Sequence, residues 1–440
     1  MKKIVGIFIC VLLVGAVISV GGQVTKNIKT NENYFNNPLS DGDKWMKTYG
    51  GKADEFGSCV QQTSDGGFII FGITESYGAG KEDFWLVKTD NNGNKIWDKT
   101  YGGKEADLAN FGRQTNDGGY IIIGRTYSFD VGKSDIWLIK TDTVGNMVWN
   151  KTFGGTGYET ASEVWQTNDS GYIIIGYSDS FGAGNRDMWL IKTDFNGNEL
   201  WNKTYGGTTD DQGHSIKQTI DGGYILAGGT YTSDNTNKFD IWLIKTDNAG
   251  EIIWNKTYGG SQHETAWSVQ QTTDGGYIIC GEKDVGGRNE YDIWLLKTDS
   301  NGELLWEKIF GGFNYDRGWS VQQTSDEGYI ITGDTFVGPR VDGLLIKTDS
   351  NGEKEWEKTY GSYYTDITIH VQQTSDGGFI LTGYYQPGWF QYRDLWLIKT
   401  DENGNAPNSY HKNYDRSMFS LRILELVPNL FPILRQLLGL

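Results

Sequence analysis

Short apolar runs recur along the chain at a regular spacing, and polar turns separate them. The triplet Lys-Thr-Asp ends one such run in every unit, and its lysines are Lys88, Lys140, Lys192, Lys245, Lys297, Lys347 and Lys399. Successive triplets are 50 to 53 residues apart. A fixed period close to this size indicates a repeat architecture, either a solenoid, a propeller or another array.

Each unit contains four runs with the apolar and β-branched character of strands. In the third unit these runs cover residues 163–167, 172–175, 188–193 and 199–205. Asn168-Asp-Ser-Gly171 and Asp194-Phe-Asn-Gly197 separate the first two and the last two runs, and this composition suits tight turns. No part of the repeats has helical periodicity, so four strands repeated around a circle predict propeller blades.

The two ends of the repeat region complement each other. The chain enters the pattern at residues 44–51 with a lone fourth strand, and it leaves at residues 395–400 with a third strand that has no fourth behind it. Pairing the two fragments would remove an exposed sheet edge, whereas an open solenoid would need polar caps. We therefore predict an all-β fold, a seven-bladed β-propeller of four-stranded antiparallel blades, closed by the N-terminal strand that completes the last blade.

The segments outside the repeats differ in composition. Residues 1–22 combine two lysines with an apolar run and predict a signal peptide, with an uncleaved anchor as the alternative. Residues 23–43 are expected to form a flexible lead-in, 44–404 the propeller, and 405–440 a linker and apolar C-terminal tail. That tail is too charged and proline-broken to span a bilayer. It would pack on the propeller, act as a retention or export tag, or associate with the membrane surface. The expected location is secreted or at the cell surface.

Net charge and cysteine content exclude some classes of function. The net charge is −17, and half of the 56 acidic residues occupy four recurring positions, so the acidity belongs to the scaffold. Nucleic acid is not an expected partner, because its recognition needs a basic face. Cys59 and Cys280 fall four blades apart, beyond disulfide reach in a ring.

Two tryptophan positions recur in the units. One is occupied in all seven, and the other in six, with Gly343 in its place in the remaining unit. Large rings at fixed blade positions usually fill the space between blades, so we expect packing rather than ligand binding there. The first set is Trp45, Trp97, Trp149, Trp201, Trp254, Trp306 and Trp356, and the second is Trp85, Trp137, Trp189, Trp242, Trp294 and Trp396.

Two rings of carboxylates also follow the repeat. An acid follows each Gly-Gly pair (Gly-Ser in the last unit) by four residues, and an aspartate opens each third strand. These acids would either accept hydrogen bonds from loop amides or share Ca²⁺, which takes six to eight oxygen ligands. Apart from this possible Ca²⁺, no cofactor is expected. The candidate calcium ligands are Glu55, Asp107, Glu159, Asp211, Glu264, Asp316 and Asp366.

Residues that break the repeat are better candidates for a site, because the scaffold does not demand them. The four histidines have no metal-ligand spacing and no evident nucleophile accompanies them, so no catalytic residue is assigned. One inner-strand position varies as Gln61, Arg113, Trp165, Lys217, Gln270, Gln322 and Gln372. Variable aromatic residues on a rigid frame are typical of binding surfaces. The candidate ligand-binding residues are Trp165, Trp267, Trp319, Trp389 and Tyr392.

The repeat unit resembles those of secreted propeller proteins of archaea and bacteria, akin to delta-60-type repeats. The resemblance covers about residues 44–404 and rests on Gln-Thr-x-Asp-Gly-Gly-Tyr-Ile-Ile-x-Gly and on Asp-x-Trp-Leu-Ile-Lys-Thr-Asp. The piece from Asp299 to Trp306 is also similar to the tryptophan-docking motif of quinoprotein-like propellers. That likeness implies that tryptophan locks blades together, and it brings no quinone cofactor because no cofactor-contacting motif is matched.

These observations favour a monomeric extracellular or cell-surface binding or adhesion propeller without catalytic activity. Its ligand, a cell-surface glycan or protein, would bind on the long-loop face. One alternative is a polysaccharide-acting enzyme that uses carboxylates of the same face. Another is a structural surface-layer component.

Overall fold

A computed structural model describes residues 39–41, 44–129, 132–231, 238–286, 291–312, 314–388 and 391–407. The predicted signal peptide and nearly all of the predicted linker and tail lie outside the described residues. In the part that is described, no helix is long and apolar enough to cross a membrane.

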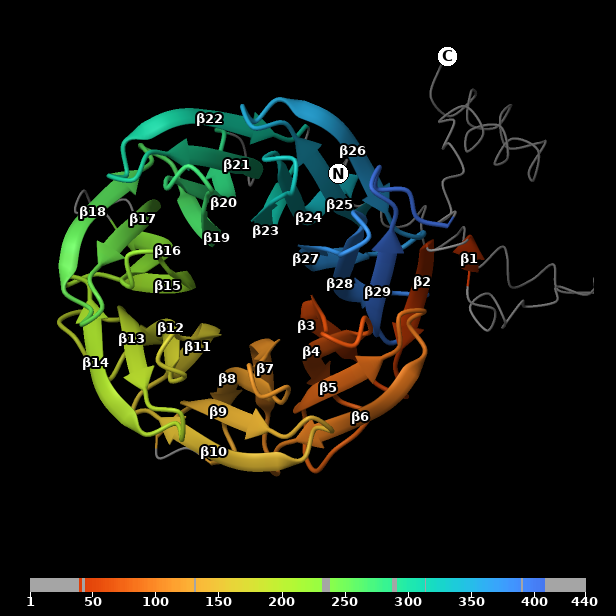
Figure 1. Ribbon diagram of the computed structural model, residues 1–440, viewed down its shortest axis with the longest axis horizontal. Coiled ribbons are helices and arrows are strands. Elements are labelled where there is room, and N and C mark those ends of the chain that lie inside the picture. Colours follow the sequence, from red (N-terminus) through yellow and green to blue (C-terminus); the bar gives the residue numbers. More distant parts are fainter. Residues whose placement is uncertain are drawn as a thin grey trace, which may run out of the picture. The chain divides into compact units, whose positions relative to one another are not determined.

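Seven antiparallel sheets stand around a central axis (Figure 1), as the repeat pattern predicts. Blade 1 consists of β3 to β6, and blades 2 to 6 follow in chain order with four strands each. Blade 7 combines β27, β28 and β29 from the end of the repeats with β2 from the beginning. The protein is therefore a seven-bladed β-propeller.

The four strand positions run from the axis outward in chain order. The innermost strands are β3 (Glu55–Gln62), β7 (Asp107–Gln114), β11 (Glu159–Gln166), β15 (Asp211–Gln218), β19 (Glu264–Gln271), β23 (Asp316–Gln323) and β27 (Ile367–Gln373). The second strands are β4 (Phe68–Thr74), β8 (Tyr120–Thr126), β12 (Tyr172–Ser178), β16 (Tyr224–Tyr231), β20 (Tyr277–Asp284), β24 (Tyr329–Val337) and β28 (Phe379–Tyr385).

The outer half of each blade carries the Lys-Thr-Asp triplet and the first tryptophan set. The third strands are β5 (Asp83–Thr89), β9 (Asp135–Thr141), β13 (Asp187–Thr193), β17 (Phe239–Thr246), β21 (Tyr291–Thr298), β25 (Arg340–Thr348) and β29 (Asp394–Thr400). The outermost strands are β6 (Lys95–Tyr101), β10 (Met147–Phe153), β14 (Glu199–Tyr205), β18 (Ile252–Tyr258), β22 (Leu304–Phe310), β26 (Lys354–Tyr360) and β2 (Lys44–Tyr49).

The ring closes in the way that the two chain fragments predict. β2 pairs antiparallel with β29, from Trp45 opposite Lys399 to Tyr49 opposite Leu395. A further strand, β1 (Leu39–Asp41), pairs with the outer edge of β2 and makes this sheet five-stranded. The sequence did not indicate β1, which lies in the segment expected to be a flexible lead-in.

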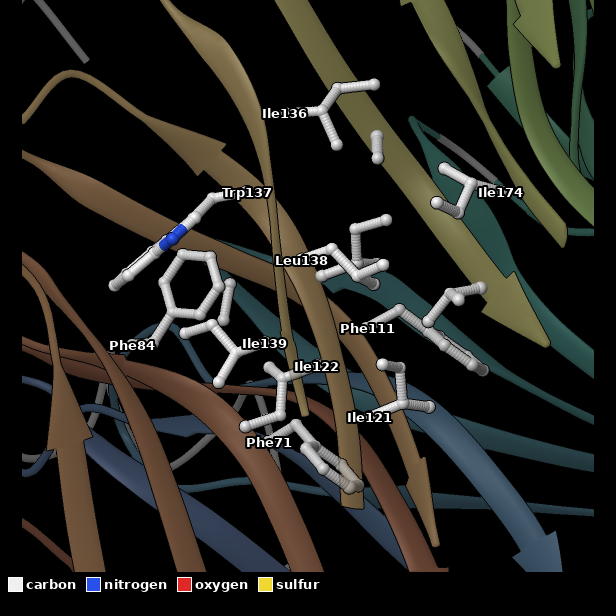
Figure 2. Close-up of a cluster of buried hydrophobic side chains, with 14 of the residues drawn as sticks. Phe71, Phe84, Phe111, Ile121, Ile122, Ile136, Trp137, Leu138, Ile139 and Ile174 are labelled. Atoms are coloured by element: carbon white, nitrogen blue, oxygen red, sulfur yellow. The ribbon is translucent and has the colours of Figure 1, made fainter. Parts of the chain in front are cut away.

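The second and third strands are buried on both faces because each blade packs between two others. Their continuous apolar runs, such as Tyr172–Ser178 and Asp187–Thr193, match the pattern expected of strands covered on both sides. Figure 2 shows one of the resulting clusters, in which Phe71 and Phe84 belong to blade 1 and Trp137 belongs to blade 2.

The first tryptophan set packs between blades, as expected. Trp45 is only 2% exposed, and its indole Nε1 donates to the backbone oxygen of Asn91 in the next blade at 3.1 Å. Its ring lies against Gly93, where φ is +71° and an added Cβ would sit 2.6 Å from the indole. Both the positive φ and the closeness of the indole require glycine at this position. The aromatic of one blade therefore rests on the turn of the next.

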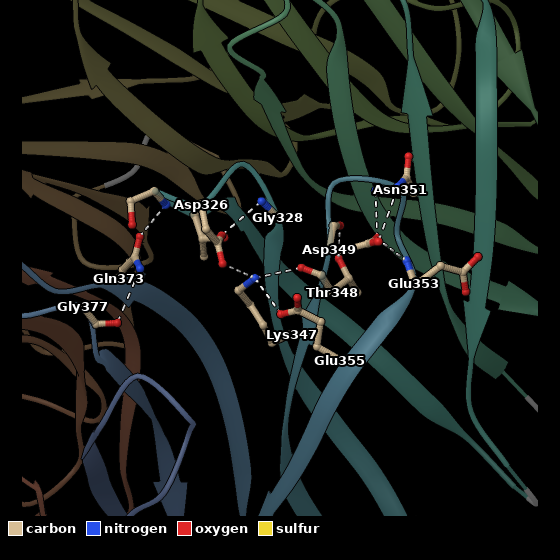
Figure 3. A network of polar contacts seen from close by, with 12 residues as sticks. Asp326, Gly328, Lys347, Thr348, Asp349, Asn351, Glu353, Glu355, Gln373 and Gly377 are labelled. Atoms are coloured by element: carbon tan, nitrogen blue, oxygen red, sulfur yellow. Dashed lines mark hydrogen bonds and ion pairs between the residues drawn. The ribbon is translucent and has the colours of Figure 1, made fainter.

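The Lys-Thr-Asp triplet makes ion pairs and hydrogen bonds at the end of each blade that lies opposite to the long loops. In Figure 3, Lys347 lies 2.8 Å from an Asp326 oxygen and donates to the Thr348 carbonyl oxygen at 2.9 Å. Gln373 of blade 7 accepts a hydrogen bond from the backbone of Ser325 in blade 6 at 2.9 Å. The buried lysine therefore ties two strands of one blade together, while the glutamine connects neighbouring blades.

Candidate functional site

A cavity of about 520 Å³ occupies the centre of the ring, and the innermost strands of all seven blades contribute to its wall. Three of the five ligand-binding candidates line it, namely Trp165, Trp267 and Trp319. Tyr392 is not among the lining residues, and its side chain is 58% exposed. Trp389 lies outside the described residues. The structure thus brings three of the candidates together, although they come from three different repeats.

A β-bulge determines which side chains of the inner strands face this cavity. In blade 1 the pairing of β3 with β4 shifts between Gly57 and Cys59, so Ser58 is the extra residue. The same shift occurs in the other six blades. One extra residue reverses the alternation of side chains after it. Glu55 at the start of β3 is consequently buried, whereas Gln61, six residues later, lines the cavity.

The variable position at Gln61 has a structural role in four blades. The side-chain oxygen of Gln61 accepts from the backbone nitrogen of Gln114 in the next blade at 2.9 Å. Gln270, Gln322 and Gln372 make the equivalent bond at 2.7 Å each. Blades 2, 3 and 4 have Arg113, Trp165 and Lys217 at this position, and none of the three side chains can accept this bond.

Those three exceptions form one cluster. The guanidinium carbon of Arg113 lies 3.4 Å from the ring centroid of Trp165, and Lys217 Nζ lies 4.6 Å from it. Both are cation–π arrangements. Glu163 completes the cluster, since its Oε1 is 2.5 Å from Lys217 Nζ and accepts from Trp165 Nε1 at 2.8 Å. The indole is therefore held by a carboxylate and contacted by two cations from the neighbouring blades.

A second group of aromatic rings arises at the bulge itself. In blades 1 to 3 the bulge residue is Ser58, Asn110 or Ser162, and each donates to a backbone oxygen of the next blade at 2.7 to 2.9 Å. Blades 4 to 6 replace these with aromatic residues. The ring centroids of His214 and Trp267 are 4.4 Å apart, and those of Trp267 and Trp319 are 4.9 Å apart. Three neighbouring blades thus present a continuous aromatic surface.

Two buried carboxylates lie behind this aromatic surface. Asp334 accepts a hydrogen bond from Trp319 Nε1, and Glu282 Oε2 lies 3.4 Å from Arg317 Nε. Burial raises the pKa of Glu282 to about 7 and that of Asp334 to about 6. Neither belongs to the residues that line the cavity. Their observed contacts indicate a role in orienting the indoles and Arg317.

The candidate calcium ligands act as hydrogen-bond acceptors within the blade junctions. Glu55 accepts from the backbone nitrogen of Gly51 at 2.9 Å and from the hydroxyl of Thr74 at 3.0 Å. Asp107 and Glu159 accept similarly from Gly103 and Gly155. This agrees with the loop-amide alternative. Within the described ranges, no three His, Cys, Asp or Glu side chains are placed to hold a metal.

The pKa values of several paired junction carboxyls are raised. Burial raises the pKa of Asp366 to about 7, and the nearby Asp342 adds to this shift. Burial and Asp240 have the same effect on Glu264, whose pKa is also about 7. Six of the seven acids open the inner strand, and Asp366 directly precedes β27. These acids are therefore part of the packed junctions between blades.

Two residues of the channel wall and two carboxylates behind it were not among the sequence candidates. Glu163, His214, Glu282 and Asp334 all occupy positions where the other repeats carry different residue types. Comparing every repeat position, rather than the inner strand alone, would have identified them. Only the structure shows that Glu282 and Asp334, on second strands, contact residues of the innermost strands.

The fold and the cavity define the class of protein as a seven-bladed β-propeller with a ligand-sized central channel. No family model matches the chain. The regulatory protein FlaEY of Caulobacter vibrioides is 24% identical over an alignment of 195 residues that covers 39% of this chain and 20% of FlaEY. The chain thus spans about a fifth of that relative's length.

Solved propeller structures are similar at low identity. Sqt1 from Chaetomium thermophilum has a TM-score of 0.46 and 11% identity over 78% of this chain and 83% of its own. The Pan2 WD40 domain of Neurospora crassa has a TM-score of 0.46 and 11% identity over 82% and 99%. An α-L-arabinanase of Penicillium chrysogenum has a TM-score of 0.43 and 12% identity over 80% and 98%.

Proposed function

We propose that this chain is a non-catalytic binding propeller, secreted or at the cell surface, that takes a glycan in its central channel. The observation that supports this is the convergence of Trp165, Trp267 and Trp319 on one cavity. All three stand at positions where other repeats carry residues that bond to the next blade. The scaffold does not require these rings, because other blades of the same ring are built with the bonding residue instead, so binding is the better reason for them.

The size and chemistry of the cavity fit this proposal. Ligand pockets usually measure about 300–1,000 Å³ and combine apolar walls with a few placed polar groups. Here aromatic faces alternate with amides and hydroxyls, such as those of Gln270, Gln322 and Ser268. Sugar rings present apolar faces and hydroxyl edges, and this wall is complementary to both.

A glycan array with the full-length protein tests the proposal. We expect a defined set of glycans to be retained, with retention lost in Trp267→Ala and Trp319→Ala. The matched control is Tyr392→Ala, which removes an exposed aromatic side chain away from the channel wall. Retention that depends on Tyr392 and not on the channel would place the site on the loops, and retention of no glycan would contradict the proposal.

A second candidate is an enzyme acting on polysaccharide. The pair Glu282 and Asp334 favours it, because a carboxyl with a raised pKa is the form that a glycosidase uses as general acid. Release of reducing ends from polysaccharides, lost in Glu282→Gln, would establish this activity. Because both carboxyls lie behind the indoles, we expect binding without cleavage.

A further inference from the structure

The cavity wall is positively charged, although the chain as a whole is strongly acidic. Arg113, Arg125 and Lys217 line it, and Glu163 is the one carboxylate among the lining residues that the structure describes. The histidines in the wall do not add charge near neutral pH, since burial lowers the pKa of His214 to about 4 and that of His370 to about 3. The wall therefore has three cations and one anion, in a protein of net charge −17.

Arg113 and Arg125 form no ion pair with a described residue, and Glu163 is the one carboxylate of the wall that acts on Arg113. Glu163 pairs with Lys217 at 2.5 Å, whereas no described residue forms an ion pair or hydrogen bond with the Arg113 side chain. Burial lowers the pKa of Arg113, which shows that its surroundings disfavour the charge. Arg113 and Lys217 share the negative charge of Glu163, while the Cys59 thiol, whose pKa burial raises to about 12, stays neutral. Two half-buried cations that share one carboxylate are only partly compensated, and a bound anion would offset the remaining charge.

The contact with Trp165 leaves the hydrogen-bonding edge of Arg113 available. Stacking at 3.4 Å uses the flat face of the guanidinium. Its N–H groups lie at the edge of that plane, and their fork matches the two oxygens of a carboxylate. Lys217 supplies a second cation over the same indole. A planar anion attached to a ring that stacks in the channel would match the fork of Arg113, and Lys217 adds a second positive charge beside the same indole.

We propose that Arg113 and Lys217, which contact Trp165 from the two neighbouring blades, bind the carboxylate of an acidic sugar residue such as a uronate. This inference rests on the proposed glycan-binding function and specifies its substrate class. Blades 1, 5, 6 and 7 carry glutamine where these blades carry Arg113, Trp165 and Lys217, so the anion site is confined to one arc of the channel.

Titration calorimetry of the full-length protein tests this with three probes, trigalacturonate, its methyl ester and the neutral galactose trimer. We expect trigalacturonate to bind at least about tenfold more tightly than the ester, because charge-assisted hydrogen bonds are roughly twice as strong as neutral ones. Arg113→Gln restores the residue of four other blades, so it should fold and remove this preference. Lys81→Gln removes one positive charge from the exposed surface and should retain it.

The possible outcomes separate a failure of the anion site from a failure of the glycan-binding function. Equal affinity for acid and ester, or a preference unchanged by Arg113→Gln, would overturn the anion site and leave the glycan-binding function standing. Binding of none of the three saccharides, with no retention on the glycan array, would overturn both. Competition by inorganic sulfate as strong as by trigalacturonate would overturn the sugar carboxylate as the recognised group. If Arg113→Gln does not fold, Arg113→Lys keeps the charge without the fork and should lower the preference partially.

Discussion

The blade junctions and the channel wall are built from the same repeats, yet they differ in how strictly they follow them. At the junctions nearly every unit has the same tryptophan, glycine turn and buried carboxylate, and each makes the same contact with the next blade. Along the channel, three consecutive blades replace a bonding glutamine, and four replace a bonding serine or asparagine, three of them with an aromatic residue. The junctions therefore explain stability, and the departures along the channel are the evidence for binding.

The largest expected effect is on the junction that closes the ring. Trp45→Ala should lower the free energy of unfolding by about 3–5 kcal/mol, as large-to-small changes of buried aromatics do. Chemical denaturation followed by fluorescence measures it. The matched channel variant is Trp165→Ala, which should lose clearly less stability because its ring is only partly buried. Equal losses would mean that the channel tryptophans also serve the scaffold.

Substitution of the channel aromatics should affect glycan binding more than stability. Trp267→Ala and Trp319→Ala should each weaken glycan binding by about 2 kcal/mol, or roughly 30-fold, as central aromatic contacts do. Calorimetry with a glycan retained on the array gives the number. Trp254→Ala, at a junction, should instead reduce stability and leave the affinity of the folded protein unchanged. A comparable loss of affinity in Trp254→Ala would erase the distinction between the two regions.

The junction carboxyls give a pH dependence with a defined sign. The pKa of Asp366 is raised to about 7, so the folded state holds a proton between about pH 4 and 7 that the unfolded state has lost. Stability must then fall as pH rises through this window. In Asp366→Asn, the free energy of unfolding should decline by about 1–2 kcal/mol less between pH 5 and 8 than it does in the unsubstituted protein. Thermal unfolding across this pH range measures it, and an unchanged slope in Asp366→Asn would contradict it.

The smallest expected effect is that of calcium. A tightly bound ion at saturating concentration stabilises by about 2–3 kcal/mol, and a chelator would abolish this. Because Glu55, Asp107 and Glu159 already accept hydrogen bonds from loop amides, we expect the melting temperature to be the same with calcium and with EDTA. A clearly lower melting temperature in the presence of EDTA would instead identify the junction acids as metal ligands.

Much of the fold could be predicted because it depends on contacts that repeat. The apolar runs gave the number of strands, and the complementary fragments at residues 44–51 and 395–400 gave the closure that β2 and β29 form. The expected packing of Trp45 follows from the same regularity. The strand β1 could not be predicted, since Leu39–Asp41 lies outside the repeat and pairs with an edge.

The candidate site was predicted in part. The departure of Trp165, Trp267 and Trp319 from the repeat was visible, and the channel contains all three. Tyr392 was chosen for its loop, but loop composition does not determine whether a side chain reaches the channel, and it does not line the cavity.

The sequence by itself determined the period, the number of blades and the way in which the ring closes, because these follow from local strand patterns and from contacts between adjacent repeats. Only the tertiary structure decided which departures from the repeat meet. The bulge in each inner strand reverses the alternation of its side chains, and the ring then directs seven such strands at one axis. Arg113, Trp165 and Lys217, each 52 residues from the next, become a single cluster for that reason.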